Sequence, residues 1–193
     1  MRHTITIEGR AFRLRPVAVA DAAFIVSLRN DPRLNQFVHP VSPRVEDQER
    51  WLARCFERLG DYYFIIERVK TGQPEGTVGL YDLDDSRRCA EWGRWVLRSR
   101  SMGALESAQL IYRVAFNVLG LDWVYCRTLV DNVKVVSFHE TFGLETHERL
   151  PGQFVFNGVP RDAIEQRITR ERWEKQRASV EAKMEALARI LSR

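Results

Sequence analysis

The sequence predicts an α+β fold built on a mixed central sheet. Between residues 62 and 97, three apolar segments follow one another with only short turns between them, which is typical of an antiparallel meander. Two helical segments precede this meander, and a helix, a strand, another helix and a last hairpin follow it. This order of elements indicates an α+β protein rather than a repeated βαβ arrangement.

The first half of the chain opens with apolar residues that alternate over positions 3–15, as expected for two short strands or a hairpin that turns at Gly9. Asp21 is predicted to cap a helix that ends near Asn30, because the residue before Pro32 disfavours helical geometry. A loop rich in proline then continues to residue 43. The remaining predicted elements are a helix at 45–59 and strands at 62–69, 77–83 and 89–97.

In the second half, apolar residues at helical spacing predict an amphipathic helix over residues 105–119. A strand at 123–130, a helix at 132–142 and a hairpin around 154–158 are expected next, and a helix from Ile164 to Arg193 closes the chain. Trp173, Val180 and Leu187 repeat every seven residues in this last helix. We expect one main domain over residues 1–165, with an amphipathic helix over 166–193 that packs on it or on a dimer partner.

The composition fits one globular domain of 193 residues with 45% apolar residues. No apolar run is long enough for a membrane span, and the N-terminus lacks the apolar core of a signal peptide. Three widely spaced cysteines form no metal-binding pattern, so we expect reduced thiols, no metal and a cytoplasmic protein. The net charge of +4 permits nucleic-acid binding, but the basic residues are interspersed with acidic ones, which makes this partner a minor alternative.

The stretch from Glu91 to Leu144 contains a strand, a basic turn at Arg98–Ala104 and the start of a helix. The first turn of a helix presents unpaired N–H groups and a positive dipole end, which together bind anions. The stretch therefore indicates a site for a phosphate-bearing ligand.

Five short motifs in this order resemble the GNAT superfamily of acetyl-CoA-dependent N-acetyltransferases. They are Leu14-Arg15-Pro16, GTVGL at 76–80, AEWG at 90–93, the turn at 98–104 and NVKVVSFHETFGL at 132–144. The resemblance implies a mostly antiparallel sheet flanked by helices, splayed at a coenzyme slot, with acetyl-CoA as co-substrate and no metal. It also implies a small-molecule amine acceptor: the segment LRNDPRLNQFVHP is similar to the branch that acetylates nucleotide-linked amino sugars, and the alternative is the branch that acetylates ribosomal-protein N-termini.

The resemblance assigns the coenzyme to the strand, the turn and the residue that opens the next helix. The expected contacts are Trp95, Val96, Leu97, Arg98, Arg100, Met102, Gly103, Ala104 and Asn132. Leu105 departs from the family pattern, which has a second small residue there. Asn132 also suits a helix cap.

Two residues are candidates for proton transfer. His139 stands where the family often has a tyrosine that protonates the leaving thiolate, and a histidine can donate a proton near neutral pH. Glu91 lies on the strand beside the slot and is a candidate base or substrate anchor, with a structural ion pair as the alternative.

The acceptor is expected to contact the proline-rich loop, where cations and aromatic rings suit a nucleotide-sugar. The candidates are Arg29, Asn30, Phe37, His39 and Tyr81. A homodimer through the C-terminal helix is a further possibility, and a non-catalytic module that binds nucleic acid or protein is the minor alternative.

Overall fold

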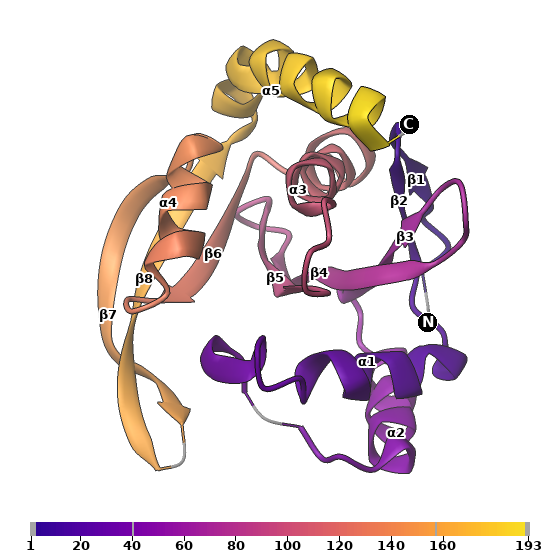
Figure 1. Cartoon of the computed structure of the whole chain (residues 1–193). Coiled ribbons are helices and arrows are strands. Elements are labelled where there is room, and N and C mark those ends of the chain that lie inside the picture. Colours follow the sequence, from indigo (N-terminus) through magenta and orange to yellow (C-terminus); the bar gives the residue numbers. More distant parts are fainter. Residues whose placement is uncertain (1–2, 40, 157, 192–193) are drawn as a thin grey trace.

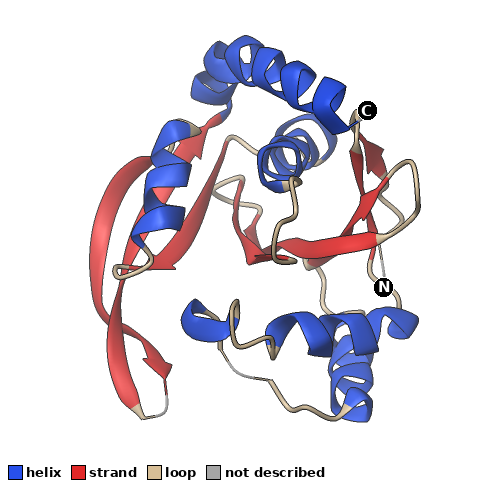
Figure 2. Cartoon of the chain, viewed as in Figure 1, coloured by secondary structure: helices blue, strands red, loops and turns tan. Residues whose placement is uncertain are grey.

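A computed structural model of the chain contains one eight-stranded sheet with helices on both faces (Figures 1 and 2). The strand order is β1-β2-β3-β4-β5-β6-β8-β7, and every neighbouring pair is antiparallel except β5 and β6. The strands are β1 (Ile7–Glu8), β2 (Phe12–Pro16), β3 (Tyr62–Arg68), β4 (Pro74–Asp84), β5 (Cys89–Leu97), β6 (Trp123–Leu129), β7 (Glu145–Phe156) and β8 (Val159–Thr169). The structure describes residues 3–39, 41–156 and 158–191, including side chains of the last helix through Ala182 and that of Glu185.

The helices divide between the two faces of the sheet (Figure 1). On one face α1 packs against α2 and the strands β4 and β5, whereas on the other α3 packs against β2, β4 and α5. The helices are α1 (Ala22–Arg29), α2 (Val45–Cys55), α3 (Ala104–Arg113), α4 (Val133–Thr141) and α5 (Arg170–Leu191). The predicted mixed, mostly antiparallel α+β architecture is confirmed.

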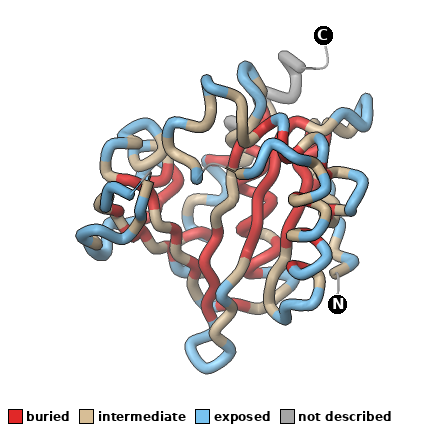
Figure 3. Tube along the Cα trace, turned by 90° about the horizontal axis from the view of Figure 1, so that it is seen from below, coloured by how far each residue is buried: buried red, intermediate tan, exposed pale blue. Residues whose placement is uncertain are grey.

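The apolar run of β3 explains how one strand supports both faces. Side chains alternate along a strand, so Phe64 and Ile66 enter the core under α3, while Tyr63 and Ile65 enter the smaller core under α1 and α2. All four side chains are at most 3% exposed. Buried residues accordingly run along the central strands, and the connecting turns are exposed (Figure 3).

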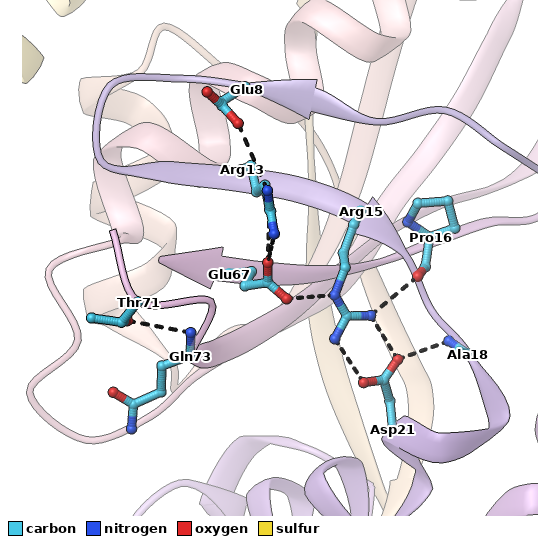
Figure 4. A network of polar contacts seen from close by, with 9 residues as sticks. All are labelled: Glu8, Arg13, Arg15, Pro16, Ala18, Asp21, Glu67, Thr71 and Gln73. Atoms are coloured by element: carbon cyan, nitrogen blue, oxygen red, sulfur yellow. Dashed lines mark hydrogen bonds and ion pairs between the residues drawn. The ribbon is translucent and has the colours of Figure 1, made fainter. Parts of the chain in front are cut away.

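A polar network ties the start of α1 to β2 and β3 (Figure 4). Arg15 donates to Glu67 at 2.6 Å and to both carboxylate oxygens of Asp21 at 2.8 Å, and Arg13 also pairs with Glu67. Asp21 accepts the N–H of Ala18 at 2.8 Å. Asp21 thus precedes α1 as predicted, but its carboxylate does not cap the helix, because it is engaged by Arg15 and the preceding turn.

The last part of the chain differs from the prediction. Residues 164–169, which were expected to begin the C-terminal helix, belong to β8, and α5 starts at Arg170. Ile164 pairs with Thr128 and Ile168 with Val124 of β6, so long-range pairing overrides a locally helical sequence.

The strand β7, which pairs with β8, is also longer than predicted. The prediction was too short because Pro151 and Gly152 look like a break in the sequence. The ladder between β7 and β8 shifts register between Leu150 and Phe154, and Gly152 adopts a positive φ of 61° there. Proline is tolerated at such a bulge on an edge strand.

Other boundaries move by a few residues. The helix predicted to end at residue 59 stops at Cys55, and β4 begins at Pro74 instead of Thr77. The helix predicted over 105–119 is α3 followed by a π-helical turn at Val114–Val118.

The C-terminal helix packs on its own chain. Trp173 is 2% exposed and Val180 is 6% exposed, and both belong to the main core. The Trp173 indole donates to Gln109 on α3 at 3.1 Å. The Leu187 side chain lies outside the described residues, and the homodimer stays a prediction.

Candidate active site

The strands β5 and β6 separate after a short parallel contact. Their pairing covers only Cys89–Glu91 against Trp123–Tyr125, and beyond it the two strands diverge. The ladder between β4 and β5 contains an extra residue at this point, and Arg94 takes a positive φ of 51°. This bulge redirects β5, so the sheet is splayed as the sequence resemblance predicted.

A cavity of about 250 Å³ occupies the splay. Its walls come from β5, β6, α4, the loop after α1 and the end of β7. The residues used below are Arg29, Phe37, His39, Tyr81, Trp92, Arg94, Trp95, Val96, Cys126, Arg127, Asn132, His139, Phe154 and Phe156. The cavity therefore brings together residues predicted for the coenzyme, residues predicted for the acceptor, and His139. The predicted coenzyme residues in its wall are Trp95, Val96 and Asn132, and the predicted acceptor residues are Arg29, Phe37, His39 and Tyr81.

Other predicted residues lie outside this cavity. Neither Glu91 nor Asn30 lies in the cavity wall, although Tyr81 and Arg127, which contact Glu91, do. Arg98 and Arg100 line a separate hollow of about 460 Å³ between the β5–α3 turn and α1, where Arg33 and Phe24 also lie. Leu97, Met102, Gly103 and Ala104 lead from β5 into α3.

The β5–α3 turn presents a helix N-terminus beside two exposed arginines. Arg100 has a positive φ of 68°, and Gly103 occupies the N-cap position of α3. Arg98 donates to the Pro74 carbonyl at 3.3 Å, whereas the exposed Arg100 carries no salt bridge to a carboxylate among the described residues. The geometry suits an anion at the first turn of α3.

Glu106, in that first turn, does not compete for the anion. Its carboxylate turns toward the β1–β2 turn and accepts the N–H groups of Arg10 and Ala11. A Cβ on Gly9 would lie 2.0 Å from Glu106 Oε1, so a larger residue at that turn would displace the Glu106 carboxylate.

Glu91 lies on the α1 and α2 face of the sheet, within an ion-pair network. Tyr81 donates its hydroxyl to Glu91 at 3.2 Å, and Arg127 donates Nη1 at 3.0 Å. Arg127 also pairs with Glu165, and Arg167 binds that carboxylate in turn. Burial raises the pKa of Glu91 to about 6, with Arg127 opposing the increase. The carboxylate can accept a proton through Tyr81 or water, and its ion pair agrees with the structural alternative as well.

Arg29 is the cation of the cavity that has no carboxylate partner in the described part of the chain. Its Nη2 donates to the His39 carbonyl at 2.8 Å, while its buried Nε has no hydrogen-bond partner among the described groups. Burial lowers the pKa of the guanidinium, and the neighbouring Arg94 lowers it further. No salt bridge to Arg29 occurs within the described ranges, whereas Arg94 pairs with Asp61 at 2.9 Å.

Aromatic rings close the side of the cavity that is formed by the loop after α1 and the end of β7. The His39 ring stacks on Phe156 with centroids 4.3 Å apart and meets Phe154 edge-on at 5.8 Å. This contact joins the loop after α1 to the β7–β8 hairpin. The sequence analysis recognised Phe154 and Phe156 only as hairpin residues, because nothing local indicates that β7 returns beside residue 39.

His139 lies on the other face of the sheet, in the wall shared by β6, β8 and α4. Its side chain is 3% exposed and its ring faces Trp92 at 5.0 Å. Nδ1 lies 3.1 Å from Cys126 Sγ and 3.2 Å from Gln166 Oε1, whereas the buried Nε2 has no hydrogen-bond partner within the described ranges. Burial lowers the pKa of His139 to about 4.

Sequence reasoning missed Arg94, Arg127, Cys126 and Gln166. Their positions depend on a bulge and on the pairing of β8 with β6. One usable signal was the alternation of Tyr125 and Arg127 on the strand that runs parallel to β5. Their side chains lie on the same face of the sheet as Glu91, which places the Arg127 cation near the Glu91 carboxylate.

Among the described residues, no group of three or more His, Cys, Asp or Glu side chains is arranged to hold a metal ion. No helix in the described part of the chain has the length and apolar character to cross a membrane.

Comparison with known proteins identifies the family. The sequence pattern of the acetyltransferase (GNAT) domain matches residues 12–145. None of the curated protein sequences compared matches the chain significantly.

Solved structures share the fold over almost the whole chain. The apo form of FdhC, described as a nucleotide-linked sugar GNAT, is 27% identical, with a TM-score of 0.78 over 92% of this chain and 97% of that one. A GCN5-related N-acetyltransferase from Brucella melitensis is 21% identical, with a TM-score of 0.81 over 93% and 85%. The spermidine/spermine N-acetyltransferase SpeG from Vibrio cholerae is 20% identical, with a TM-score of 0.74 over 87% and 99%. The chain therefore belongs to the GNAT family and is an acetyl-CoA-dependent N-acetyltransferase.

Proposed function

We propose that this enzyme transfers an acetyl group from acetyl-CoA to the primary amine of a nucleotide-linked amino sugar. The observation that carries the proposal is Arg29, a cation in the cavity wall without a carboxylate partner among the described residues. Burying an uncompensated cation is costly, and an anionic acceptor would offset that cost. A nucleotide-sugar supplies a diphosphate that can accept Arg29 hydrogen bonds.

The surroundings of Arg29 suit the rest of such an acceptor. His39, Phe154 and Phe156 offer ring faces at the mouth of the same cavity, where a base or sugar can pack. A polyamine such as spermidine, for which SpeG is named, carries the same charge sign as Arg29 and is disfavoured. The 27% identity to a nucleotide-linked sugar GNAT supports the same class.

Acetyl-CoA is proposed to run along the splay, with its thioester in the cavity. The unpaired edge of β5 at Trp95, Val96 and Leu97 offers backbone groups to the pantetheine arm, and Asn132 faces it from the start of α4. The diphosphate is assigned to Arg98, Arg100 and the N–H groups of Met102, Gly103 and Ala104. The coenzyme supplies the activated acetyl group, and these residues bind and orient it.

Glu91 is proposed as the group that helps to deprotonate the acceptor amine, through Tyr81 or a water molecule. Its pKa of about 6 leaves it ionised at neutral pH and closer in basicity to an amine than an ordinary carboxylate is. The three buried, unpaired cysteines fit the reducing cytoplasm expected for this protein.

The proposal is tested by following thiol release with four acceptors: a UDP-linked amino sugar, the free amino sugar, a peptide with a free N-terminus, and spermidine. We expect the UDP-linked sugar to have the highest kcat/KM. Arg29→Met should raise KM for that sugar by roughly tenfold to a hundredfold, the equivalent of one charged hydrogen-bonded contact, while barely affecting the free sugar.

The matched control is Arg87→Met, since Arg87 is exposed, pairs with Asp84 and lies outside both the central cavity and the hollow beside α1. It should leave KM unchanged. Preference for the peptide would favour the ribosomal-protein type of acceptor, and an unchanged KM in Arg29→Met would remove the anion site.

A further inference from the structure

One nitrogen of His139 has no hydrogen-bond partner among the described residues. The side chain is 3% exposed and lines the cavity, yet no described group makes a hydrogen bond to Nε2. Buried polar atoms are normally hydrogen-bonded, so an orphaned atom in a cavity wall is available to a substrate.

The protonation of the other nitrogen follows from Gln166, which is fully buried on β8. The Gln166 amide donates to the Val136 carbonyl at 3.2 Å, so its amide nitrogen faces α4 and its oxygen faces His139. A carboxamide oxygen only accepts, so the contact of 3.2 Å with Gln166 Oε1 is a hydrogen bond only when Nδ1 carries the hydrogen. Cys126 Sγ, 3.1 Å from Nδ1, is then a weak second acceptor, whereas a thiol donating to Nδ1 would leave this Gln166 contact without a hydrogen. We assign the hydrogen to Nδ1. In a neutral ring this leaves a lone pair on Nε2.

The neighbouring titratable groups do not supply a compensating charge. Burial raises the pKa of the Cys126 thiol on β6 and of the Tyr112 hydroxyl on α3, so both are neutral at pH 7. Glu91 and Glu165 project from the opposite face of the sheet, where Arg127 pairs with both. Burial holds the pKa of His139 at about 4, so the ring is neutral at pH 7 and Nε2 is an acceptor.

This state does not suit a histidine that waits as a proton donor, which is the role inferred from its place in the sequence. We propose instead that His139 shuttles one proton from the acceptor amine to the coenzyme sulfur, and that Gln166 is the positioning residue that keeps Nε2 ready to accept it. The inference rests on the acetyltransferase activity, but not on which amine is the acceptor.

The shuttle balances the reaction. The ammonium form of the acceptor first loses one proton to Glu91 through Tyr81 or water, as proposed above. The neutral amine nitrogen then forms a bond to the acetyl carbon, and Nε2 takes the second proton that this nitrogen loses. The carbon–sulfur bond breaks with its electron pair on sulfur, and the imidazolium returns the same proton from Nε2 to that sulfur. His139 ends neutral in its starting tautomer, with Nδ1–H still bound to Gln166. A low histidine pKa favours the second transfer, because the protonated ring is a strong acid toward a thiolate.

The variant Gln166→Glu separates the shuttle from a waiting donor. A carboxylate still accepts Nδ1–H, but its charge raises the His139 pKa and leaves more of the ring protonated at neutral pH. A His139 ring that is already protonated cannot take a proton from the amine. If His139 is a shuttle, the ratio of variant to wild-type kcat/KM should therefore fall at least about tenfold from pH 8.5 to pH 6. A waiting donor predicts the opposite slope. Titration of the acceptor amine affects the variant and the wild type equally, so it does not change the ratio of their kcat/KM values.

Gln109→Glu is the matched control, since Gln109 is also buried on the same face and keeps its acceptor role toward Trp173. We expect its ratio to be independent of pH. A parallel response of the two variants would mean that a buried carboxylate alone causes the effect, and the proposal would fail.

A measurement without substrate covers the case in which Gln166→Glu does not fold. In the ¹⁵N NMR spectrum of the histidine-labelled wild-type protein, the His139 signals should report Nδ1–H and a bare Nε2 at pH 7, and should titrate below pH 5. Cys126→Ala removes the other neighbour of Nδ1 and should leave this tautomer unchanged. A proton on Nε2 at pH 7 would overturn the inference, and this readout is independent of whether the acceptor is a nucleotide-sugar.

Discussion

Glu91 illustrates how burial and pairing act on a single side chain. It is 7% exposed and receives hydrogen bonds from Tyr81 and Arg127, yet its pKa is raised to about 6 because burial outweighs these contacts. An ordinary glutamate titrates near 4.5. The folded protein therefore holds this proton more tightly than the unfolded chain does between these two values.

The sign of the resulting pH dependence follows directly. Because the folded state binds more protons in this window, the free energy of unfolding falls as the pH rises from 4.5 to 6, and the loss is complete above pH 7. The difference corresponds to about 2 kcal/mol at 1.36 kcal/mol per pKa unit. Glu91→Gln should remove it, so the variant gains about 2 kcal/mol relative to wild type between pH 4.5 and pH 8.

Urea unfolding at the two pH values measures this gain. Glu46→Gln, at an exposed position in the first turn of α2, serves as the control and should show no such gain. A constant difference between Glu91→Gln and wild type would mean that the carboxylate keeps an ordinary pKa in the fold.

Among the elements, the β5–α3 turn and the splay between β5 and β6 depend on different local features. The splay depends on a bulge at Arg94 and on the end of parallel pairing after Glu91, whereas the turn depends on the positive φ of Arg100 and on the N-cap at Gly103. The arginines of the turn line a hollow beside α1 and not the central cavity. A coenzyme that contacts both must therefore leave the cavity along β5 and pass the first turn of α3.

This arrangement predicts the effect of reversing one charge in the turn. Acetyl-CoA should raise Tm of the wild-type protein, since a ligand of the native state stabilises it by about 2.7 kcal/mol at a concentration of 100 Kd. Arg100→Glu should weaken binding by roughly tenfold to a hundredfold, because it replaces a cation near the diphosphate with an anion. Calorimetric titration gives the two Kd values.

Arg44→Glu is the control for the change of net charge. Arg44 is exposed at the start of α2, far along the chain from the turn, and this substitution should leave Kd unchanged. Equal affinity of Arg100→Glu and wild type would exclude the turn as the diphosphate site.

For the whole molecule, the C-terminal helix completes the main core. Trp173 contacts Phe116 at 5.2 Å between ring centroids and donates to Gln109, and Val180 is buried in the same cluster. The sequence left open whether this helix packs on its own domain or on a partner. These contacts join residues that are about a third of the chain apart, so α5 and the sheet are expected to unfold together.

Trp173→Ala should lower the free energy of unfolding by about 3–5 kcal/mol, the usual cost of removing a large buried aromatic side chain. Lys175→Ala, whose side chain is 73% exposed, should change it by less than about 0.5 kcal/mol. Denaturant unfolding at several protein concentrations tests both. If the loss in Trp173→Ala depended on protein concentration, the helix would be stabilising an assembly rather than the single chain.

Local patterns and short motifs were enough to predict the class of fold, most of the elements and some of the residues that line the cavity, among them Arg29 and His139. Alternation and helical spacing located β3, β5, β6, α3 and α4 to within a few residues. Only the tertiary structure decided that residues 164–169 form a strand, since their pairing with β6 is long-range and outweighs local helical preference. It likewise decided the state of His139. The tautomer depends on Gln166, which is 27 residues away in the chain, and the lowered pKa depends on burial that no local pattern specifies.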